Sequence, residues 1–213
     1  MPKITLDIWS DVVCPWCWIG KHRVERALAA AGLEADWRFH AYELGARQQT
    51  RQPTLKHLAE KYKVSLEEAR TMTERVQTLG TELGIDINPD VQQTAASFDA
   101  HRLMVAAQKV GLGKPLMERL HRAYFSEGLD ISDHAVLLGL VVEVVLDATE
   151  AKRVLDTDAY SQEVETAEQQ AAAYQIGGVP YTVVNMQLAI SGAQSEETFG
   201  QAFAQALADA AKV

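Results

Sequence analysis

The chain has 213 residues, of which 47% are hydrophobic, and a formal net charge of −9. A chain of this size can bury a substantial core, either as one domain with an insertion or as two small domains. Acidic and basic residues are interspersed, so the surface should repel polyanions, and we expect no nucleic-acid partner. We find no apolar run of the roughly 18 residues that a membrane span needs and no signal-peptide pattern. We therefore expect a cytoplasmic protein without a membrane partner.

A strand, a helix and a second strand are expected at the start of the chain. Apolar side chains alternate over residues 3–9, which is the period of a half-buried strand. Residues 19–31 then carry apolar side chains at helical spacing, and Gly32 is a suitable stop for that helix. A second alternating segment over residues 35–44 predicts another strand.

The middle of the chain, from about residue 53 to residue 160, has helical patterns. Ser65 and Glu68 form a capping box ahead of a helix that is expected to end near Gly84. The residues after Asp133 are rich in valine and would also suit a buried strand, but we favour a helix capped by Asp133. Further helix starts are expected at Pro115, Thr149 and Asp158, with ends near Gly128 and Gly177.

The last segment returns to strands. Residues 178–185 and 188–191 both read as strands, and the two residues between them predict an antiparallel hairpin. A closing helix is expected over residues 195–211. The expected order is therefore β-α-β, several helices, then β-β-α, which is an α/β fold.

Both cysteines of the chain, Cys14 and Cys17, lie between the first strand and the first helix. A structural zinc site needs four ligands, but there is no second cysteine pair and the six histidines show neither HxxxH nor HExxH spacing. We therefore expect no metal, and we expect the histidines to be helix-surface or satisfied core residues. A bridge that closes so short a loop constrains the unfolded chain very little, which argues against a structural crosslink.

A redox-active dithiol fits the cysteine stretch best. A thiol attacks only as the thiolate, and the start of a helix favours the negative charge on Cys14. Pro15 suits the first helical turn, and the turn brings Cys17 back toward Cys14, so that Cys17 can resolve a mixed disulfide. Asp11 is a candidate proton acceptor for Cys17, although an exposed turn aspartate is an equally good interpretation.

The sequence resembles the thioredoxin fold of the DsbA family and, more narrowly, its FrnE-like branch. Five segments carry the resemblance: IWSDVVCPWCWIGK (8–21), SFDAHRL (97–103), RAYFSEGLDISDH (122–134), GVPYTVVN (178–185) and ISGAQ (190–194). The resemblance implies a thioredoxin-like domain made of residues 1–45 and 160–213, interrupted by an inserted helical domain over residues 46–159.

The resemblance also implies roles for individual residues. Cys14 would be the nucleophile, Cys17 the resolving thiol, and Pro180 a cis-proline beside them, with the backbone of Val179 offered to an extended substrate. Trp18 is expected to pack into the core. The residues expected to contact substrate are Asp11, Pro15, Trp16, Phe98, His101, Val179 and Tyr181.

The leading functional hypothesis is a thiol-disulfide oxidoreductase or disulfide isomerase that acts on polypeptides or small disulfides. Its redox group would be the Cys14–Cys17 disulfide, with no bound cofactor and with glutathione as a candidate co-substrate. The related kappa-type glutathione transferases and 2-hydroxychromene-2-carboxylate isomerases are the alternative, but they usually place serine where Cys14 stands. A noncatalytic binding module is a third hypothesis.

Overall fold

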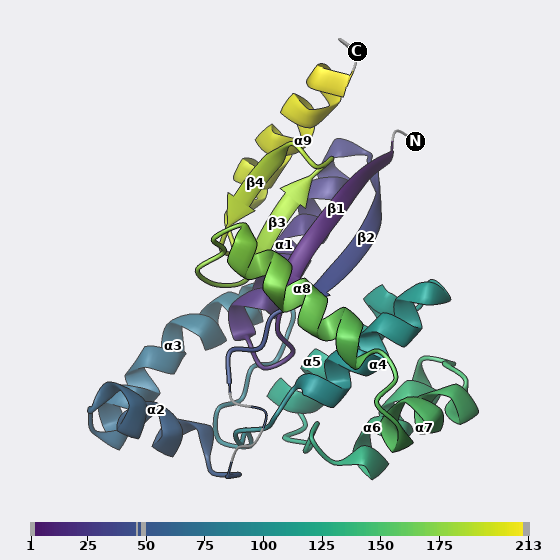
Figure 1. Ribbon diagram of the computed structural model, residues 1–213. Helices are drawn as coiled ribbons and strands as arrows, with labels where there is room; N and C mark the ends of the chain where they lie inside the picture. The colour runs from purple at the N-terminus through teal and green to yellow at the C-terminus, as the bar shows by residue number, and fades with distance from the viewer. Residues whose placement is uncertain (1–2, 46, 48–49, 211–213) are drawn as a thin grey trace.

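A mixed four-stranded sheet forms the centre of the molecule. The computed structural model describes residues 3–45, 47 and 50–210. The strands are β1 (Lys3–Ser10), β2 (Glu34–Ala41), β3 (Tyr181–Val184) and β4 (Leu188–Ser191), in the spatial order β2-β1-β3-β4 (Figure 1). β1 pairs with β2 in parallel and with β3 antiparallel, and β3 and β4 form the predicted antiparallel hairpin.

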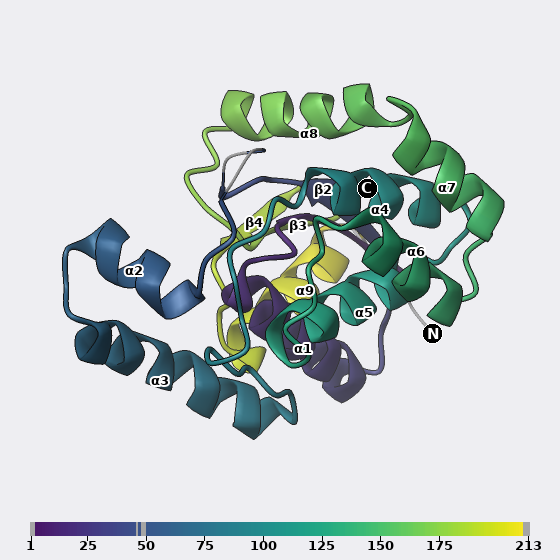
Figure 2. The ribbon, with the colours of Figure 1, turned by 90° about the horizontal axis from the view of Figure 1, so that it is seen from below.

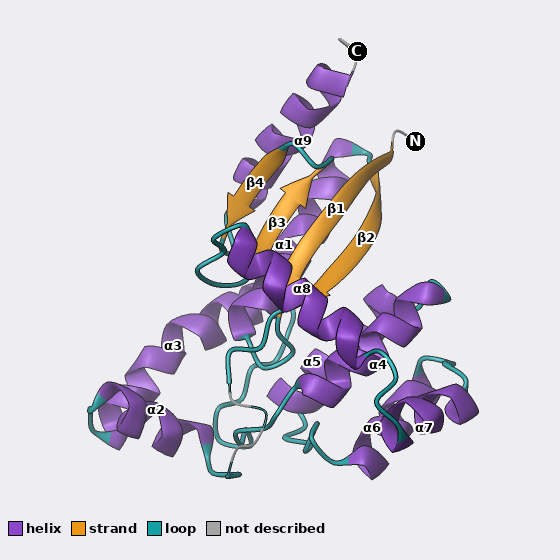
Figure 3. Cartoon of the chain, in the orientation of Figure 1, coloured by secondary structure: helices purple, strands orange, loops and turns teal. Residues whose placement is uncertain are grey.

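Helices cover both faces of the sheet because β1 alternates as its sequence predicts. Ile4, Leu6 and Ile8 are buried in the main core on the side of α1 (Pro15–Ala31) and α9 (Glu196–Ala210), which pack against each other. On the opposite face, α8 (Ser161–Ala173) crosses the sheet (Figure 3), and Trp9 Nε1 donates a hydrogen bond to the Ala167 carbonyl of α8 at 3.2 Å.

Six further helices lie between β2 and α8, in two groups. The first group is α2 (Thr54–Tyr62) and α3 (Leu66–Leu83); the second is α4 (Phe98–Lys109), α5 (Gly113–Phe125), α6 (His134–Glu143) and α7 (Ala148–Asp156). Figure 2 shows the two groups on opposite sides of α1. The order β-α-β, helices, β-β-α is thus the predicted thioredoxin fold with helical segments inserted. The division into domains at residues 46 and 160 stays a prediction, and residue 46 lies outside the described residues. Residue 211, the last residue of the predicted closing helix, also lies outside them.

The best-predicted helices are those with strong caps. Ser65 and Glu68 form both hydrogen bonds of a capping box, and Gly84 ends α3 with a left-handed backbone, φ 79°. The Asp133 carboxylate accepts hydrogen bonds from the backbone N–H groups of Ala135 and Val136, which confirms that the valine-rich segment begins as a helix.

Two predicted helix starts are wrong. Asp147 caps α7, and its carboxylate accepts a hydrogen bond from the backbone N–H of Thr149, so Thr149 lies inside the first turn. α8 begins after Tyr160, which has a left-handed backbone with φ 64°. The predicted cap Asp158 lies earlier and contributes only its carbonyl, which accepts a hydrogen bond from the Ser161 N–H at 3.0 Å.

Two helix ends, those predicted at Gly128 and Gly177, were also misplaced. α5 ends at Phe125, and Gly128 instead turns the chain beyond it, with φ 65°. α8 ends at Ala173, four residues before Gly177. Pro115 does lie in the first turn of α5, where its missing N–H is tolerated.

Candidate active site

The two cysteines lie at the N-terminus of α1. Cys14 is the N-cap residue, Pro15 occupies the first turn, and the backbone N–H of Cys17 donates to the Cys14 carbonyl at 3.0 Å. This turn brings the two cysteines within 3.4 Å of each other, and both are free thiols. The predicted local geometry is therefore confirmed, and a disulfide needs only a small further approach of the two sulfur atoms.

The loop before β3 lies against this helix start. The Val179–Pro180 peptide bond is cis, and the thiol of Cys14 donates a hydrogen bond to the Val179 carbonyl at 3.6 Å. Gly20 allows the approach, since a Cβ at this position would lie 3.0 Å from Cγ of the Pro180 ring. Cys14, Val179 and Pro180 are thus brought together as the resemblance implies, and their roles in catalysis stay predictions.

The environment of Cys17 favours its neutral form. Burial raises the pKa of the Cys17 thiol well above its usual range, and the hydrogen bond and charge of Cys14 raise it further. Hydrogen bonds from the Ser10 side chain and the Asp11 backbone offset only part of this effect. Cys17 is therefore a protonated thiol at neutral pH, which suits a residue that reacts second.

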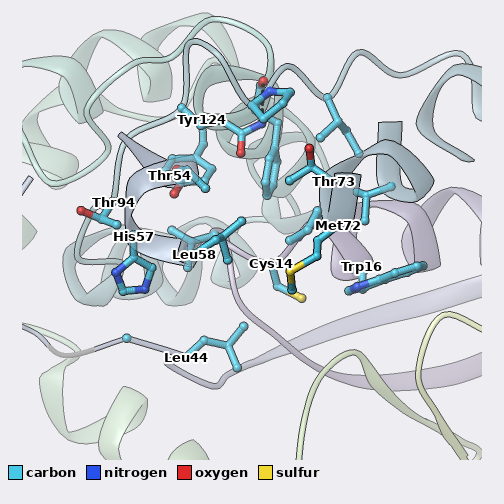
Figure 4. A pocket seen from close by; sticks show the side chains of 18 of the residues that line it. Cys14, Trp16, Leu44, Thr54, His57, Leu58, Met72, Thr73, Thr94 and Tyr124 are labelled. Carbon is cyan, nitrogen blue, oxygen red and sulfur yellow. Dashed lines mark hydrogen bonds between the residues drawn. The ribbon is translucent and has the colours of Figure 1, made fainter. Parts of the chain in front are cut away.

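A cavity of about 320 Å³ opens beside Cys14, between the helix start and the first group of inserted helices. Figure 4 shows the Cys14 sulfur with the side chains of Trp16 and Met72, and with Leu58 and His57 on another wall. The lining is mostly apolar and includes Val13, Cys14, Pro15, Trp16, Leu44, His57, Leu58, Lys61, Tyr62, Met72, Val76, Tyr124 and Phe125. The cavity places a ligand of small-molecule or side-chain size against one sulfur of the dithiol.

Asp11 is fully buried, so the interpretation as an exposed turn residue is wrong. One carboxylate oxygen accepts a hydrogen bond from His101 Nε2 at 3.2 Å, and the other accepts from the Leu44 N–H at 2.7 Å. Burial alone would raise the pKa of Asp11, but the hydrogen bond and charge of His101, with hydrogen bonds from Leu44 and Ser97, lower it. The hydrogen bonds of the charged Asp11 carboxylate thus order the loop around the cysteines.

The remaining predicted substrate contacts are divided between the cavity and other parts of the fold. Pro15 and Trp16 line the cavity. Phe98 instead lies under the guanidinium of Arg47, 3.8 Å from the ring centroid, and packs against the cluster beneath α8. Tyr181 packs edge-on against Trp9. Contact with substrate at these four residues and at Val179, Asp11 and His101 stays a prediction.

Trp18 lies in the first turn of α1 and is buried, as predicted. It hydrogen-bonds to Glu118, the centre of a cluster of charged side chains. Both oxygens of Glu118 accept from the indole Nε1 of Trp18 at 3.1 Å, and one also accepts from Lys21 Nζ at 2.7 Å and from His22 Nε2 at 3.2 Å. Partial burial opposes the charge of Glu118, but the hydrogen bond from His22 and the charge of Lys21 outweigh it and hold the pKa of Glu118 well below its usual range.

Glu118→Gln is expected to lower the free energy of unfolding at neutral pH by on the order of 1 kcal/mol. Because the pKa of Glu118 is lowered by folding, its stabilisation is present above the unfolded value of about 4.3 and is lost as the pH falls below it. Urea unfolding from neutral to acid pH should show the two proteins converging in acid. Glu82→Gln, at an exposed position, is the control. If the difference in unfolding free energy between the wild type and Glu118→Gln stays the same from neutral to acid pH, the assigned role of Glu118 is wrong.

His121 was missed by the sequence analysis, which expected satisfied or exposed histidines. It lies on α5, is fully buried, and has no hydrogen-bond partner at Nδ1. The sequence did indicate that His121 is buried, because it lies four residues from the apolar Met117 and Phe125 and therefore on the same helix face. The wall of the cavity formed by α2 and α3, including His57, Lys61 and Met72, was also missed, because no motif marks it.

Neither a metal cluster nor a membrane-spanning helix emerges from the described part of the chain. Over residues 3–45, 47 and 50–210 no three histidine, cysteine or acidic side chains gather closely enough to hold a metal ion. No helix in these ranges is both long and apolar enough to cross a bilayer.

Comparisons with known proteins agree with the fold. The solved structure of the probable DsbA oxidoreductase SCO1869 from Streptomyces coelicolor is 34% identical, with 96% of this chain and 90% of that chain covered and a TM-score of 0.88. The uncharacterized protein YwbO from Bacillus subtilis is 26% identical over 93% of this chain and 95% of its own length. The cytosolic disulfide reductase DsbM from Pseudomonas aeruginosa, solved with GSH, is 18% identical, with 98% of each chain covered and a TM-score of 0.64.

The family model of the DSBA-like thioredoxin domain matches residues 5–204, which is nearly the whole chain. The match includes the dithiol, the inserted helices and the hairpin that begins after Pro180. The chain therefore belongs to the family of DSBA-like thioredoxin domains.

Proposed function

We propose that the protein is a thiol-disulfide oxidoreductase that uses Cys14 as its nucleophile and Cys17 as its resolving thiol. The observation that carries the proposal is the pair of free, buried thiols 3.4 Å apart at the start of α1, of which Cys14 lines the large cavity and Cys17 is held protonated by a raised pKa. A dithiol with this asymmetry has one group that reacts with substrate and one that reacts only within the protein.

The reaction then proceeds in two exchanges. The Cys14 thiolate attacks one sulfur of a substrate disulfide, a Cys14–substrate bond forms, and the other half of the substrate leaves as a thiolate. Cys17 next attacks the Cys14 sulfur, loses its proton, and displaces the second thiolate, so that two electrons pass from the dithiol to the substrate. Run in reverse, the same steps oxidise a substrate dithiol or rearrange a substrate disulfide.

The cavity supports a substrate with an apolar body next to its sulfur. Its lining is mostly apolar, and His57 and Lys61 supply the nitrogen groups that could take a carboxylate. Small disulfides, including glutathione, match this description, and the DsbM structure was solved with GSH. The half-buried Val179 could also pair with the backbone of an extended polypeptide substrate.

We further place the chain in the FrnE-like branch and in the cytoplasm. The CPWC stretch and the GVPY segment support the branch, and the cytosolic address printed for DsbM is consistent with the location. A reducing compartment keeps dithiols of this kind mostly reduced, which favours disulfide reduction or isomerisation over net oxidation.

Equilibration of the purified protein with glutathione buffers tests the function. We expect a reversible two-electron transition in tryptophan fluorescence, because Trp16 and Trp18 flank Cys17 in the sequence. The transition should disappear in Cys17→Ser, and its midpoint in the wild type would give the favoured direction. If no transition occurs and glutathione still binds saturably, the glutathione transferase or 2-hydroxychromene-2-carboxylate isomerase alternative replaces the proposal.

A further inference from the structure

A second, closed cavity lies directly behind Cys17. It has a volume of about 10 Å³ and shares no lining residue with the large cavity beside Cys14. Its walls come from both the sheet and the helices: Ile8, Ser10, Cys17, Gly20, Lys21, Val24, Phe39, His121, Pro180, Thr182 and Phe199. This volume is near the lower limit for one water molecule, and several of its walls are polar.

His121 lines this cavity and has one ring nitrogen without a partner among the described residues. Its Nε2 lies 3.5 Å from the Asp11 carbonyl, which can only accept, so Nε2 carries the ring proton and Nδ1 does not. Nδ1 is buried and has no hydrogen-bond partner. The ring is held in position by stacking on Trp18, with centroids 5.9 Å apart, and by a tilted contact with Phe125 at 6.0 Å. A buried acceptor needs a hydrogen-bond partner, and a water molecule in the cavity would supply one to Nδ1.

The surroundings of His121 keep its ring neutral at rest, and the nearby carboxylates offset part of the cost of protonating it. Burial lowers the pKa of His121 to about 3, and the nearby charge of Lys21 also lowers it. The carboxylates of Glu118 and Asp11 act in the opposite direction, as does the hydrogen bond to the Asp11 carbonyl. Among the described residues, Lys21, Glu118 and Asp11 are the titratable groups that act on the ring, and the Cys17 thiol lines the same cavity.

We propose that His121 accepts the proton of the Cys17 thiol, through one water molecule in the shared cavity, as Cys17 attacks the mixed disulfide. The inference rests on the proposed function, because it concerns the second exchange. The Cys17–Cys14 bond forms while the bond from Cys14 to the substrate sulfur breaks. The substrate leaves with the bonding electrons as a thiolate, and the proton passes from Cys17 to Nδ1 and afterwards returns to water.

Proton transfer during the attack removes the need to ionise Cys17 beforehand. A free Cys17 thiolate is rare, because its pKa is raised by burial. As the new S–S bond forms, the attacking sulfur loses its affinity for the proton, so even a weak base can take it. His121 is therefore a general base for the resolving step, acting through a water molecule without touching the substrate.

Single-turnover reaction with 5,5′-dithiobis(2-nitrobenzoate), with reduced protein in excess, separates the two exchanges. Cys14 releases the first nitrothiobenzoate and Cys17 the second, and stopped-flow absorbance follows both. His121→Gln keeps polar atoms but has no basic nitrogen, so we expect the second phase to slow by about 100-fold while the first is unchanged. Over about pH 6 to 9, the variant's second phase should rise roughly tenfold per pH unit, because it now requires the free thiolate, whereas the wild type should depend less steeply on pH.

The controls separate failure of this inference from failure of the proposed function. Cys17→Ser keeps a single thiol and should lack the second phase; if a second nitrothiobenzoate is still released as fast as in the wild type, Cys17 is not the resolving thiol and the proposed function fails whatever His121 does. His134→Gln, at an exposed histidine of α6, should match the wild type in both phases. A His121→Gln protein with an unchanged second phase, or with both phases slowed equally, would overturn the inference.

If His121→Gln does not fold, as judged by circular dichroism, the wild type alone still decides. A proton in transfer during the attack predicts a normal solvent deuterium isotope effect on the second phase and none of that size on the first. A second phase that is insensitive to heavy water would overturn the role of His121.

Discussion

Cys14→Ser is expected to lower the rate of reaction with disulfides by at least about 100-fold, because each unit by which the Cys17 pKa is raised removes a factor of ten in its thiolate. Cys14 and Cys17 are equally buried, each 3% exposed, but only Cys14 lines the large cavity, and burial raises the pKa of Cys17 so that its thiol stays protonated. Release of nitrothiobenzoate under the single-turnover conditions above measures the effect. This loss should be the largest that any single substitution in the site produces.

Cys17→Ser is the matched control, since it changes the same atom at the neighbouring cysteine. It should retain the first exchange and, with glutathione disulfide, accumulate a stable adduct of one glutathione on Cys14, which mass spectrometry of the intact protein detects. If Cys14→Ser reacts as fast as Cys17→Ser, the nucleophile is Cys17 and the roles derived from burial are reversed. If neither variant reacts, the dithiol is not the reacting group.

The sheet and the dithiol could be predicted because their signals are local. Alternation over residues 3–9 marks β1, and CPWC at a strand-to-helix junction indicates a dithiol. The hairpin was predicted from a short connection, although its turn has three residues, 185–187, and not the two predicted. Helix boundaries were less certain because several polar residues can compete for one cap, as Asp147 and Thr149 do before α7. The choice between them depends on which carboxylate meets free N–H groups, and that is a property of the folded backbone.

The surroundings of the dithiol depend on contacts that no local pattern records. The partner of Asp11, His101, lies 90 positions away on α4, and His121 lines a cavity assembled from both the sheet and the helices. The cavity beside Cys14 requires α3 to pack against α1, which brings Met72 near the cysteine stretch. Sequence reasoning therefore found the reactive atoms and missed most of the groups that control their protons and their access.

Asp11→Ala is expected to lower the free energy of unfolding by about 3–5 kcal/mol, the range for breaking a buried charged pair by removing one partner. The substitution leaves buried His101 and the Leu44 N–H without their acceptor. Urea unfolding at neutral pH measures the change. Asp7→Ala is the matched control, because Asp7 on β1 pairs with His40 on β2 at 2.9 Å but both side chains are partly exposed, so its loss should cost at most about 1 kcal/mol.

The pH dependence of the Asp11→Ala effect distinguishes lost charge from lost volume. Folding lowers the pKa of Asp11, so the carboxylate stabilises the protein above its unfolded value of about 3.9, and this stabilisation is lost as the pH falls toward the folded value. The difference between wild type and variant should therefore be full near neutral pH and shrink below about pH 4. A difference that is small at neutral pH, or that does not change in acid, would mean that Asp11 contributes by packing alone, and the loop around the cysteines would then be ordered by other contacts.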